Sequence, residues 1–293
     1  MVNEVPGGWF VDGRCINCDA SRQIAPNLIV ERNGRSAISW QPQDETEIDL
    51  LHAAAYACPT RSIRPPSGRL NHARDPFPLR LDEDLYLCGH NSPHTAGANS
   101  FLLVRHDRVL MVDTPRWSES LAARFETYGN VTDILLTHID HAAHGRRYAD
   151  RFGASLWMHE GDATSAVGAD KVLRGLDSTE IVDGVIAYPI PGHTEGSVLY
   201  VADERYCFTG DSLYWSRATS DIEIFQNVVW YSLPELATSL ERLVGQLRFE
   251  WILPGHGDRK RLPAEEMSRR MHALTARVQA LQPQPPDLSA TRW

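Results

Sequence analysis

The sequence predicts an α/β protein in which helices pack on β-sheets, preceded by a small α+β unit. Two observations predict this class. Beyond residue 79, short runs rich in Val, Leu and Ile alternate with amphipathic helical segments, which is the pattern of sheets covered by helices. Before residue 64, two apolar runs are joined by Asn33-Gly34, the dipeptide that most favours a two-residue hairpin turn.

The amino-terminal unit is predicted over residues 9–64 as a strand, a hairpin and a helix. The helix is expected over 44–57, because acidic residues stand in its first turn and Cys58-Pro59 ends it. Residues after 64 are rich in Pro, Gly and Arg and show no apolar period. We therefore predict a first domain at 1–66, a linker at 67–78 and a second domain at 79–293.

In the second domain, the apolar periodicity predicts the following elements. Strands are expected at 85–88, 101–105, 108–113, 133–138, 155–160, 197–202, 205–211 and 249–257, and helices at 118–129, 144–153, 233–247 and 263–282.

Composition narrows the classes of partner. The chain has 293 residues, of which 42% are hydrophobic and 23% charged, and its net charge is -9. This acidity argues against a nucleic-acid partner, which would require clustered Lys and Arg. No apolar run approaches the roughly 18 residues needed to cross a bilayer, and no basic segment followed by an apolar one stands at the start. We expect a cytoplasmic protein with no membrane partner and a small-molecule substrate.

Four residues with metal-binding side chains each follow a β-type run within one or two positions. They are His138 in DILLTH, His193 in YPIPGH, Asp211 in YCFTGD and His256 in WILPGH. Taken alone, each of these residues is more often an ordinary turn residue than a metal ligand. Because the carboxyl ends of strands in an α/β layer meet at one edge, the four together predict a metal site there.

The motifs around these residues resemble those of the metallo-β-lactamase superfamily. They are Val112-Asp113-Thr114, Thr137-His138, PGHTEGS, TGD and PGHG, within about 80–262. The resemblance implies a four-layer αβ/βα sandwich and a metal-dependent enzyme. It also implies a metal held by His138, His193, Asp211 and His256, with Asp113 as a supporting group and Asp211 able to bridge two metals.

The second motif departs from that family. The family pattern is THxHxDH, whereas this chain has Thr137-His138-Ile139-Asp140-His141-Ala142-Ala143-His144-Gly145. Asp140 therefore stands where the second His is expected, and two alanines replace the Asp-His pair. Asp140, His141 and His144 are candidate replacement ligands, and we count them with His138 as candidate catalytic residues. His141 and His144 would share a face if a helix begins here. The alternative is a solvated first helical turn.

Three functions remain open. His138, His193 and Asp211 match the two-His, one-carboxylate set of non-haem iron enzymes and resemble the iron site of persulfide dioxygenases in this superfamily. We therefore favour an iron oxidoreductase or oxygenase, mono- or dinuclear, that acts on a small molecule. The alternative is a zinc hydrolase of an ester, thioester or lactam. The third is a non-catalytic metal-binding partner protein.

Three of the five cysteines predict a second metal site, separate from the one predicted for the histidines and Asp211. Cys15-Ile16-Asn17-Cys18 and the distant Cys58-Pro59 resemble a ferredoxin-like module, with Ser21 where a third cysteine is expected. The resemblance implies a [4Fe-4S] cluster completed by Ser21, Asp19 or a small molecule, or a [3Fe-4S] cluster, and an electron donor as partner. The alternatives are a module that has lost its cluster and a zinc site. The combination of such a module with the metallo-β-lactamase motifs resembles a family of bacterial fusion proteins. In that family, the second metallo-β-lactamase motif is roughly THxDDxxDH.

Overall fold

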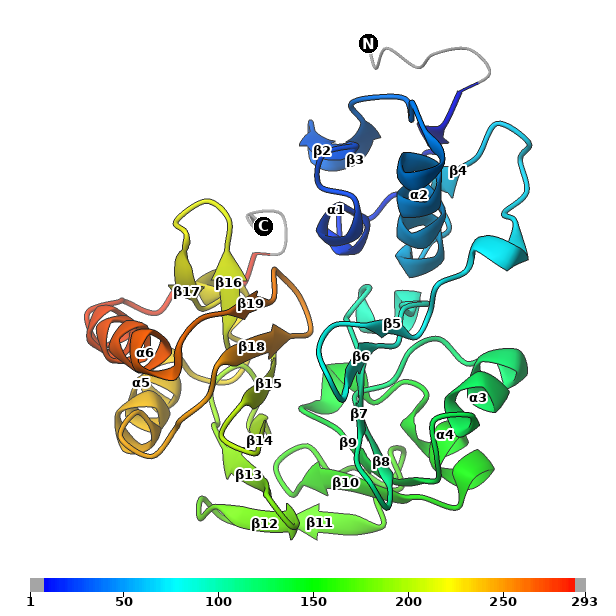
Figure 1. Ribbon diagram of the computed structural model, residues 1–293. Helices are drawn as coiled ribbons and strands as arrows, with labels where there is room; N and C mark the ends of the chain where they lie inside the picture. The colour runs from blue at the N-terminus through cyan, green and yellow to red at the C-terminus, as the bar shows by residue number, and fades with distance from the viewer. Residues whose placement is uncertain (1–7, 288–293) are drawn as a thin grey trace.

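The computed structural model describes residues 8–287. Its larger part contains two β-sheets that lie face to face (Figure 1). The first has seven strands in the order β11-β10-β9-β8-β7-β6-β5, in which β8 to β11 pair in parallel and the rest pair antiparallel. Its strands are β5 (Leu79–Arg80), β6 (Leu85–Leu87), β7 (Phe101–Val104), β8 (Val109–Val112), β9 (Val131–Leu135), β10 (Ser155–His159) and β11 (Lys171–Leu173).

The second sheet has six strands in the order β12-β13-β14-β15-β18-β19. Only β15 and β18 pair in parallel. Its strands are β12 (Thr179–Val182), β13 (Val185–Pro189), β14 (Val198–Ala202), β15 (Tyr206–Gly210), β18 (Trp251–Pro254) and β19 (Lys260–Arg261), and a separate hairpin joins β16 (Tyr214–Ser216) to β17 (Asp221–Glu223). Strands β11, β12, β16, β17 and β19 were not predicted from the sequence.

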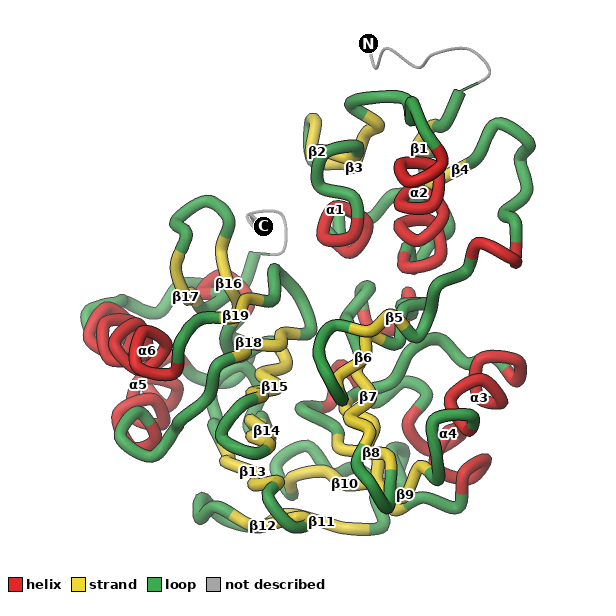
Figure 2. Tube along the Cα trace, viewed as in Figure 1, coloured by secondary structure: helices red, strands yellow, loops and turns green. Residues whose placement is uncertain are grey.

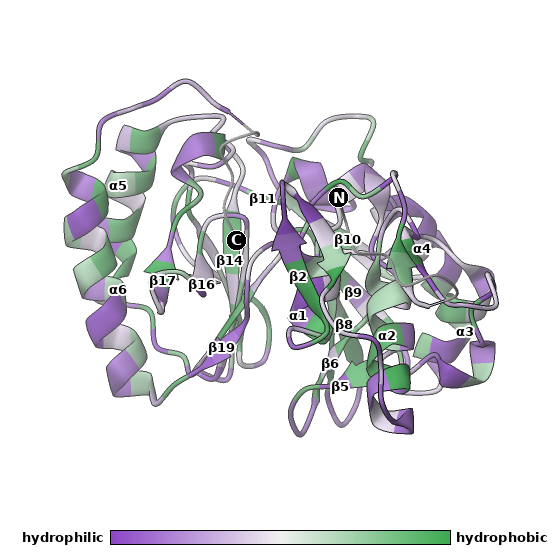
Figure 3. Ribbon diagram, turned by 90° about the horizontal axis from the view of Figure 1, so that it is seen from above, coloured by the Kyte–Doolittle hydropathy of each residue, from purple (hydrophilic) through white to green (hydrophobic). Residues whose placement is uncertain are grey.

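Helices cover the outer face of each sheet (Figure 1). α3 (Glu119–Glu126) and α4 (Gly145–Phe152) pack on the first sheet, and α5 (Leu233–Leu243) and α6 (Ala264–Gln279) pack on the second. Seen from above, the two helix pairs lie on opposite sides of the strands, and α5 and α6 show mixed polar and apolar surfaces (Figure 3). This arrangement confirms the predicted αβ/βα sandwich. No helix among residues 8–287 is long and apolar enough to cross a membrane.

Three buried clusters hold the four layers together. Between the sheets, Phe101 of β7 lies 5.5 Å from Phe208 of β15, measured between ring centroids. Leu240 of α5 and Met271 of α6 belong to the cluster under the second sheet, and Phe125 of α3 belongs to the one under the first. Burial of such side chains contributes about 1.5–3 kcal/mol each, so the layers are held mainly by the hydrophobic effect.

The amino-terminal module lies above the sandwich and has the predicted hairpin and long helix (Figure 2). It contains β1 (Phe10–Val11), α1 (Ala20–Ile24), β2 (Ile29–Arg32), β3 (Arg35–Ile38), α2 (Glu45–Ala57) and β4 (Ile63–Arg64). The Asp44 side chain accepts a hydrogen bond from the Glu47 N–H, which fixes the start of α2. The short helix α1 was not predicted. Residues 1–7 and 288–293 of the predicted domains lie outside the described residues.

The segment predicted as a linker makes buried contacts with the sandwich. Phe77 is buried in the cluster that also contains Leu51 of α2 and Leu87 of β6. Two residues earlier, Asp75 accepts hydrogen bonds from His90 at 3.0 Å and from Arg124 of α3 at 2.9 Å. These contacts join the module, the segment and the sandwich through one core.

We expect Asp75→Asn to lower the free energy of unfolding by about 1–3 kcal/mol, because it removes two charge-assisted hydrogen bonds from a buried carboxylate. Burial alone would raise the pKa of Asp75, but His90 and Arg124 hold it below its usual value. A depressed pKa stabilises the fold above the unfolded-state pKa, so this contribution is lost as the pH falls below about 4. Denaturant unfolding at pH 7 and pH 3 measures it. An equal difference at both pH values would contradict the assignment.

Candidate metal centre

The candidate ligands lie where strands end. Asp113 follows β8, His193 follows β13, Asp211 follows β15 and His256 follows β18, while His138 comes three residues after β9. Strands β8 and β9 run parallel, and β13, β15 and β18 run in one direction in the second sheet. The carboxyl ends of these strands therefore meet at one edge of the sandwich, as expected for a ligand site.

Three imidazoles approach one oxygen of Asp211, those of His138, His141 and His193. His138 Nε2 lies 3.8 Å from Asp211 Oδ2, and His193 Nε2 lies 3.9 Å from the same oxygen. Asp140 completes the group, because its Oδ2 is 4.0 Å from His138 Nε2 and 3.7 Å from His193 Nε2. The histidines are buried, whereas the Asp140 side chain is 52% exposed. The group thus has one side open to solvent.

The imidazole nitrogens of this group fit a bound cation. The Nε2 atoms of His138 and His193 are buried and have no hydrogen-bond partner among residues 8–287. A buried polar atom left unpaired costs about 1–3 kcal/mol, which a metal–ligand bond would offset. Burial, and then the charges of His141 and His193, lower the pKa of His138 well below its usual value. His138 therefore stays in the neutral form that binds metals.

Asp211 and His256 form the other side of the site. His256 Nε2 donates to the Ala96 carbonyl at 3.3 Å, and its Nδ1 faces both carboxylate oxygens of Asp211 at 2.9 and 3.0 Å. Burial would raise the pKa of Asp211, but His256 and His141 hold it well below its usual value. His256 thus contacts Asp211 directly, although it joins neither of the two groups of three ligand atoms that lie within 4.8 Å of one another in the described chain.

His141 lies between two carboxylates. Its Nδ1 donates to Asp113 at 2.8 Å, and its Nε2 lies 3.6 Å from Asp211. Although burial opposes it, the charges of Asp113 and Asp211 raise the pKa of His141 to about 10. Asp113 also accepts hydrogen bonds from the Thr137 N–H and hydroxyl. Asp113 therefore positions both His141 and the residue that precedes His138.

His141 and His144 do not share a helix face, contrary to one sequence expectation. A 3₁₀ turn covers Ile139–His141, and α4 begins only at Gly145. The His144 ring contacts the Ser92 hydroxyl at 3.1 Å and lies beside His94, so it does not reach the group around Asp211. Gly145, the first residue of α4, packs closely on β10, since a Cβ there would lie 3.1 Å from the Leu156 side chain.

Asp162 was not predicted from the sequence. Its carboxylate connects the turn that carries His138 to the turn that carries His193. Its carboxylate accepts hydrogen bonds from the Ile139 N–H at 2.8 Å, the Thr194 hydroxyl at 2.7 Å and the Gly196 N–H at 3.0 Å. Ile139 follows the ligand His138, and Thr194 follows the ligand His193. Asp162 comes three residues after the end of β10 in HEGD, so its strand-end position was the available signal.

The three cysteines of the amino-terminal module lie near one another, since both Cys15 and Cys58 affect the pKa of Cys18. Cys15 Sγ accepts a hydrogen bond from the Ser36 N–H at 3.4 Å, and Cys58 Sγ accepts one from the Ser62 N–H at 3.2 Å. Burial, followed by the nearby Cys58, raises the pKa of Cys18 to about 12. Buried sulfurs that receive N–H bonds are typical of cluster sites. Within residues 8–287 the three sulfurs do not gather within 4.8 Å, a wider spacing than one zinc ion would require.

Neither candidate for the fourth cluster ligand is free. The Ser21 hydroxyl donates to the Ala54 carbonyl of α2 at 3.1 Å. Asp19 is buried and pairs with Arg22 and with Arg217, which comes from the sandwich. The side chains of this chain thus offer three cluster ligands, and Asp19 instead connects the module to the sandwich. Cys88 and Cys207 are buried in the sandwich, as expected of small apolar residues.

Comparison with known proteins agrees with this geometry. The family model of the metallo-beta-lactamase superfamily matches residues 95–256, more than half of the chain. The chain belongs to the metallo-beta-lactamase superfamily. Residues 11–64 match the model of the 4Fe-4S single cluster domain of Ferredoxin I. The protein is therefore a metalloenzyme of the metallo-beta-lactamase fold with a ferredoxin-like module, as the sequence resemblance implied.

Several curated relatives in the superfamily are named hydroxyacylglutathione hydrolase. The protein from Fuscovulum blasticum is 30% identical over 176 residues, which cover 54% of this chain and 69% of that protein. The protein from Cereibacter sphaeroides is 30% identical over 149 residues, or 48% of this chain. The present chain spans 58% of that second relative and 61% of a third, from Rhizobium meliloti.

Solved structures show the same fold at low sequence identity. A metallo-beta-lactamase from Pontibacter korlensis has a TM-score of 0.52 and 15% identity, and the match covers 69% of this chain and 98% of that chain. DIM-1 metallo-beta-lactamase has a TM-score of 0.51 and 18% identity, with 68% and 95% covered. These structures therefore establish the fold and say nothing about the substrate.

We expect Asp162→Ala to weaken metal binding by about 10- to 100-fold, because outer groups that orient metal ligands contribute that much. Metal content after dialysis against graded chelator concentrations measures the effect. His193→Ala, which removes a ligand, should lose metal completely, and Asp150→Ala, on the exposed face of α4, should match the unaltered protein. Wild-type metal retention in the Asp162 variant would show that this carboxylate does not position the ligands.

Proposed function

We propose that this protein is a metallohydrolase of a thioester or ester. The observation that carries the proposal is a pair of overlapping ligand groups whose buried imidazole Nε2 atoms have no hydrogen-bond partner in the described chain. One group is His138, Asp140 and His193, and the other is His138, His141 and Asp211. The names of the curated relatives support hydrolysis, which the sequence analysis placed second to iron redox chemistry.

The altered second motif changes the set of metal ligands. Ala142 and Ala143 stand where the family pattern has Asp and His, and neither side chain can bind a metal. His141 lies beside Asp211 instead, and its Nε2 is buried without a hydrogen-bond partner in the described chain, so His141 can bind a metal from the other side of Asp211. A divalent ion held by imidazoles and carboxylates supplies Lewis-acid chemistry, which polarises a carbonyl and makes water nucleophilic near neutral pH.

The residues of this chain would orient substrate and move the proton. A cavity of about 600 Å³ opens beside Asp140 and is lined by Ala142, Ala143 and Arg147. The small alanine side chains leave room for an acyl group, and Arg147 could attract a carboxylate on the leaving thiol. Asp140 is exposed between His138 and His193 and is therefore placed to accept a proton from the attacking water.

We expect the zinc- or iron-loaded protein to hydrolyse a hydroxyacylglutathione thioester, measured by release of free thiol. Asp211→Ala should lower kcat/KM by about 100-fold or more, because it removes both a ligand and the partner of His256. Glu241→Ala, on the exposed face of α5, serves as the control. Equal rates in the Asp211 variant and the unaltered protein would contradict the proposal, and so would the absence of hydrolysis by fully metal-loaded protein.

A second candidate, an iron oxidoreductase, is favoured by the contacts between the two metal-binding regions. Cys18 packs against Gly97, where an added Cβ would lie 2.9 Å from the Cys18 sulfur. The neighbouring Ala96 carbonyl accepts the hydrogen bond from His256, which in turn contacts Asp211. A short path of bonded and packed groups thus joins the cysteines to the metal ligands.

Metal and sulfide analysis of anaerobically purified protein separates these two candidates. Under the redox alternative we expect acid-labile sulfide, and more iron than the metal centre of the sandwich alone would hold. Cys18→Ala should then lose the sulfide and retain the metal of the sandwich. Under the hydrolase proposal, Cys18→Ala should leave thiol release unchanged. Loss of thioester hydrolysis together with the sulfide would show that the cluster takes part in the reaction.

A further inference from the structure

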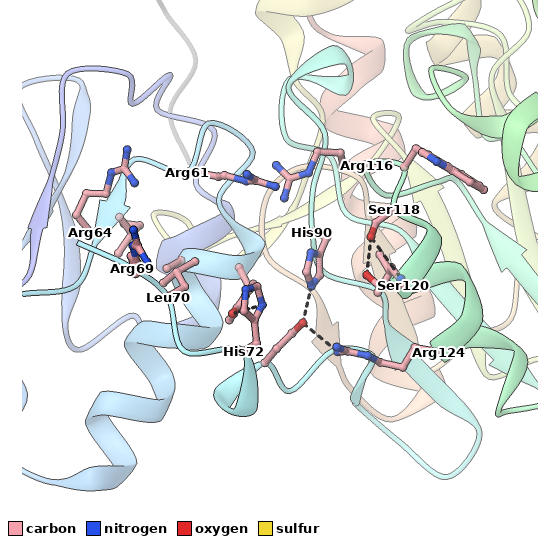
Figure 4. A pocket seen from close by; sticks show the side chains of 16 residues that line it. Arg61, Arg64, Arg69, Leu70, His72, His90, Arg116, Ser118, Ser120 and Arg124 are labelled. Atoms are coloured by element: carbon pink, nitrogen blue, oxygen red, sulfur yellow. Dashed lines mark hydrogen bonds and ion pairs between the residues drawn. The ribbon is translucent and has the colours of Figure 1, made fainter. Parts of the chain in front are cut away.

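A second cavity, of about 690 Å³, lies between the amino-terminal module and the sandwich (Figure 4). Its walls come from three parts of the chain. Tyr56 and Arg61 belong to the module, Leu70 to the connecting segment, and Arg116 and Trp117 to the sandwich. None of the candidate metal ligands lines it, so it is separate from the metal centre.

The cavity carries an excess of positive charge. Five arginines line it against a single carboxylate, that of Asp75. Arg64 pairs with Asp12, and Arg124 pairs with Asp75. The remaining three, Arg61, Arg69 and Arg116, have no carboxylate within 4.0 Å among residues 8–287. Three guanidinium groups are therefore available to an anion.

Arg116 and Arg61 are placed against each other. Their side chains extend toward one another across the cavity (Figure 4). Burial, and then the charge of Arg61, lower the pKa of Arg116. The Arg116 guanidinium donates one hydrogen bond in the described chain, a 3.4 Å contact to the Pro59 carbonyl. Arg61 has a φ of 52°, in the left-handed region that a residue with a Cβ rarely adopts. Two like charges held together in this way favour a bound anion between them.

Next to the arginines, the wall is apolar and aromatic. Tyr56, Leu70, Trp117 and Leu121 line the same cavity. Its volume falls in the range of about 300–1,000 Å³ typical of sites for small organic ligands and exceeds the size of a single inorganic ion. Guanidinium forks match the planar pairs of oxygens of carboxylates and phosphates.

We propose that this cavity binds a small organic anion with phosphate or carboxylate groups held by Arg61, Arg69 and Arg116, and an apolar part against Trp117 and Leu70. The site is independent of the proposed hydrolase activity. Because its walls come from both the module and the sandwich, the ligand would stabilise the junction between them.

Calorimetric titration of the full chain with inorganic diphosphate, at low and moderate salt, tests the proposal. We expect saturable binding that weakens with salt and raises the melting temperature. Arg61→Met and Arg116→Met should each weaken it by about tenfold or more, since a charge-assisted hydrogen bond is lost in each. Arg61 is exposed, so its variant should fold normally even if Arg116→Met does not.

Two further variants distinguish this site from the metal centre and from a general charge effect. Arg248→Met removes an exposed arginine of the sandwich and should bind diphosphate like the unaltered protein. His193→Ala should also retain binding. Unchanged affinity in both cavity variants would overturn the proposal. So would loss of binding in His193→Ala, because the diphosphate would then bind at the metal centre, and so would a lack of binding by the unaltered protein.

Discussion

The largely buried carboxylate of Asp211 is the group on which the rest of the metal centre depends. It lies at the end of β15, where the imidazoles of His138, His193 and His256 approach it from the ends of other strands. A carboxylate and several imidazoles removed from water at one point are stable only if a cation or protons balance them. The ligand turns are accordingly held by further buried carboxylates, those of Asp113 and Asp162.

The amino-terminal module is part of the same structural unit as this centre. Its helices share a hydrophobic core with the first sheet, and Asp19 pairs with Arg217 of the sandwich. Cys18 packs against Gly97, one residue from the carbonyl that holds His256. A change at the cysteines would therefore reach the metal ligands through packed groups. The arginine-lined cavity lies at the same junction, where the module and the sandwich both supply positive charge.

Several features could be predicted because they depend on residues close in sequence. The hairpin at Asn33-Gly34 and the start of α2 at Asp44 follow from local backbone preferences. The strand-end positions of His193, Asp211 and His256 follow from apolar runs that end in turns. Short edge strands such as β12 and β19 were missed, because they have little apolar pattern and depend on neighbours that are distant in sequence.

The fold class, the family and the residue types available at the metal centre could be predicted from the sequence, because strand periodicity and strand-end motifs are local properties. Which of these groups meet depends on the tertiary structure. It placed Asp140 beside His138 and His193, turned His144 away toward Ser92, and held His141 between Asp113 and Asp211. The reason is that α4 begins only after residue 144, and the direction of each side chain before it depends on contacts with other strands.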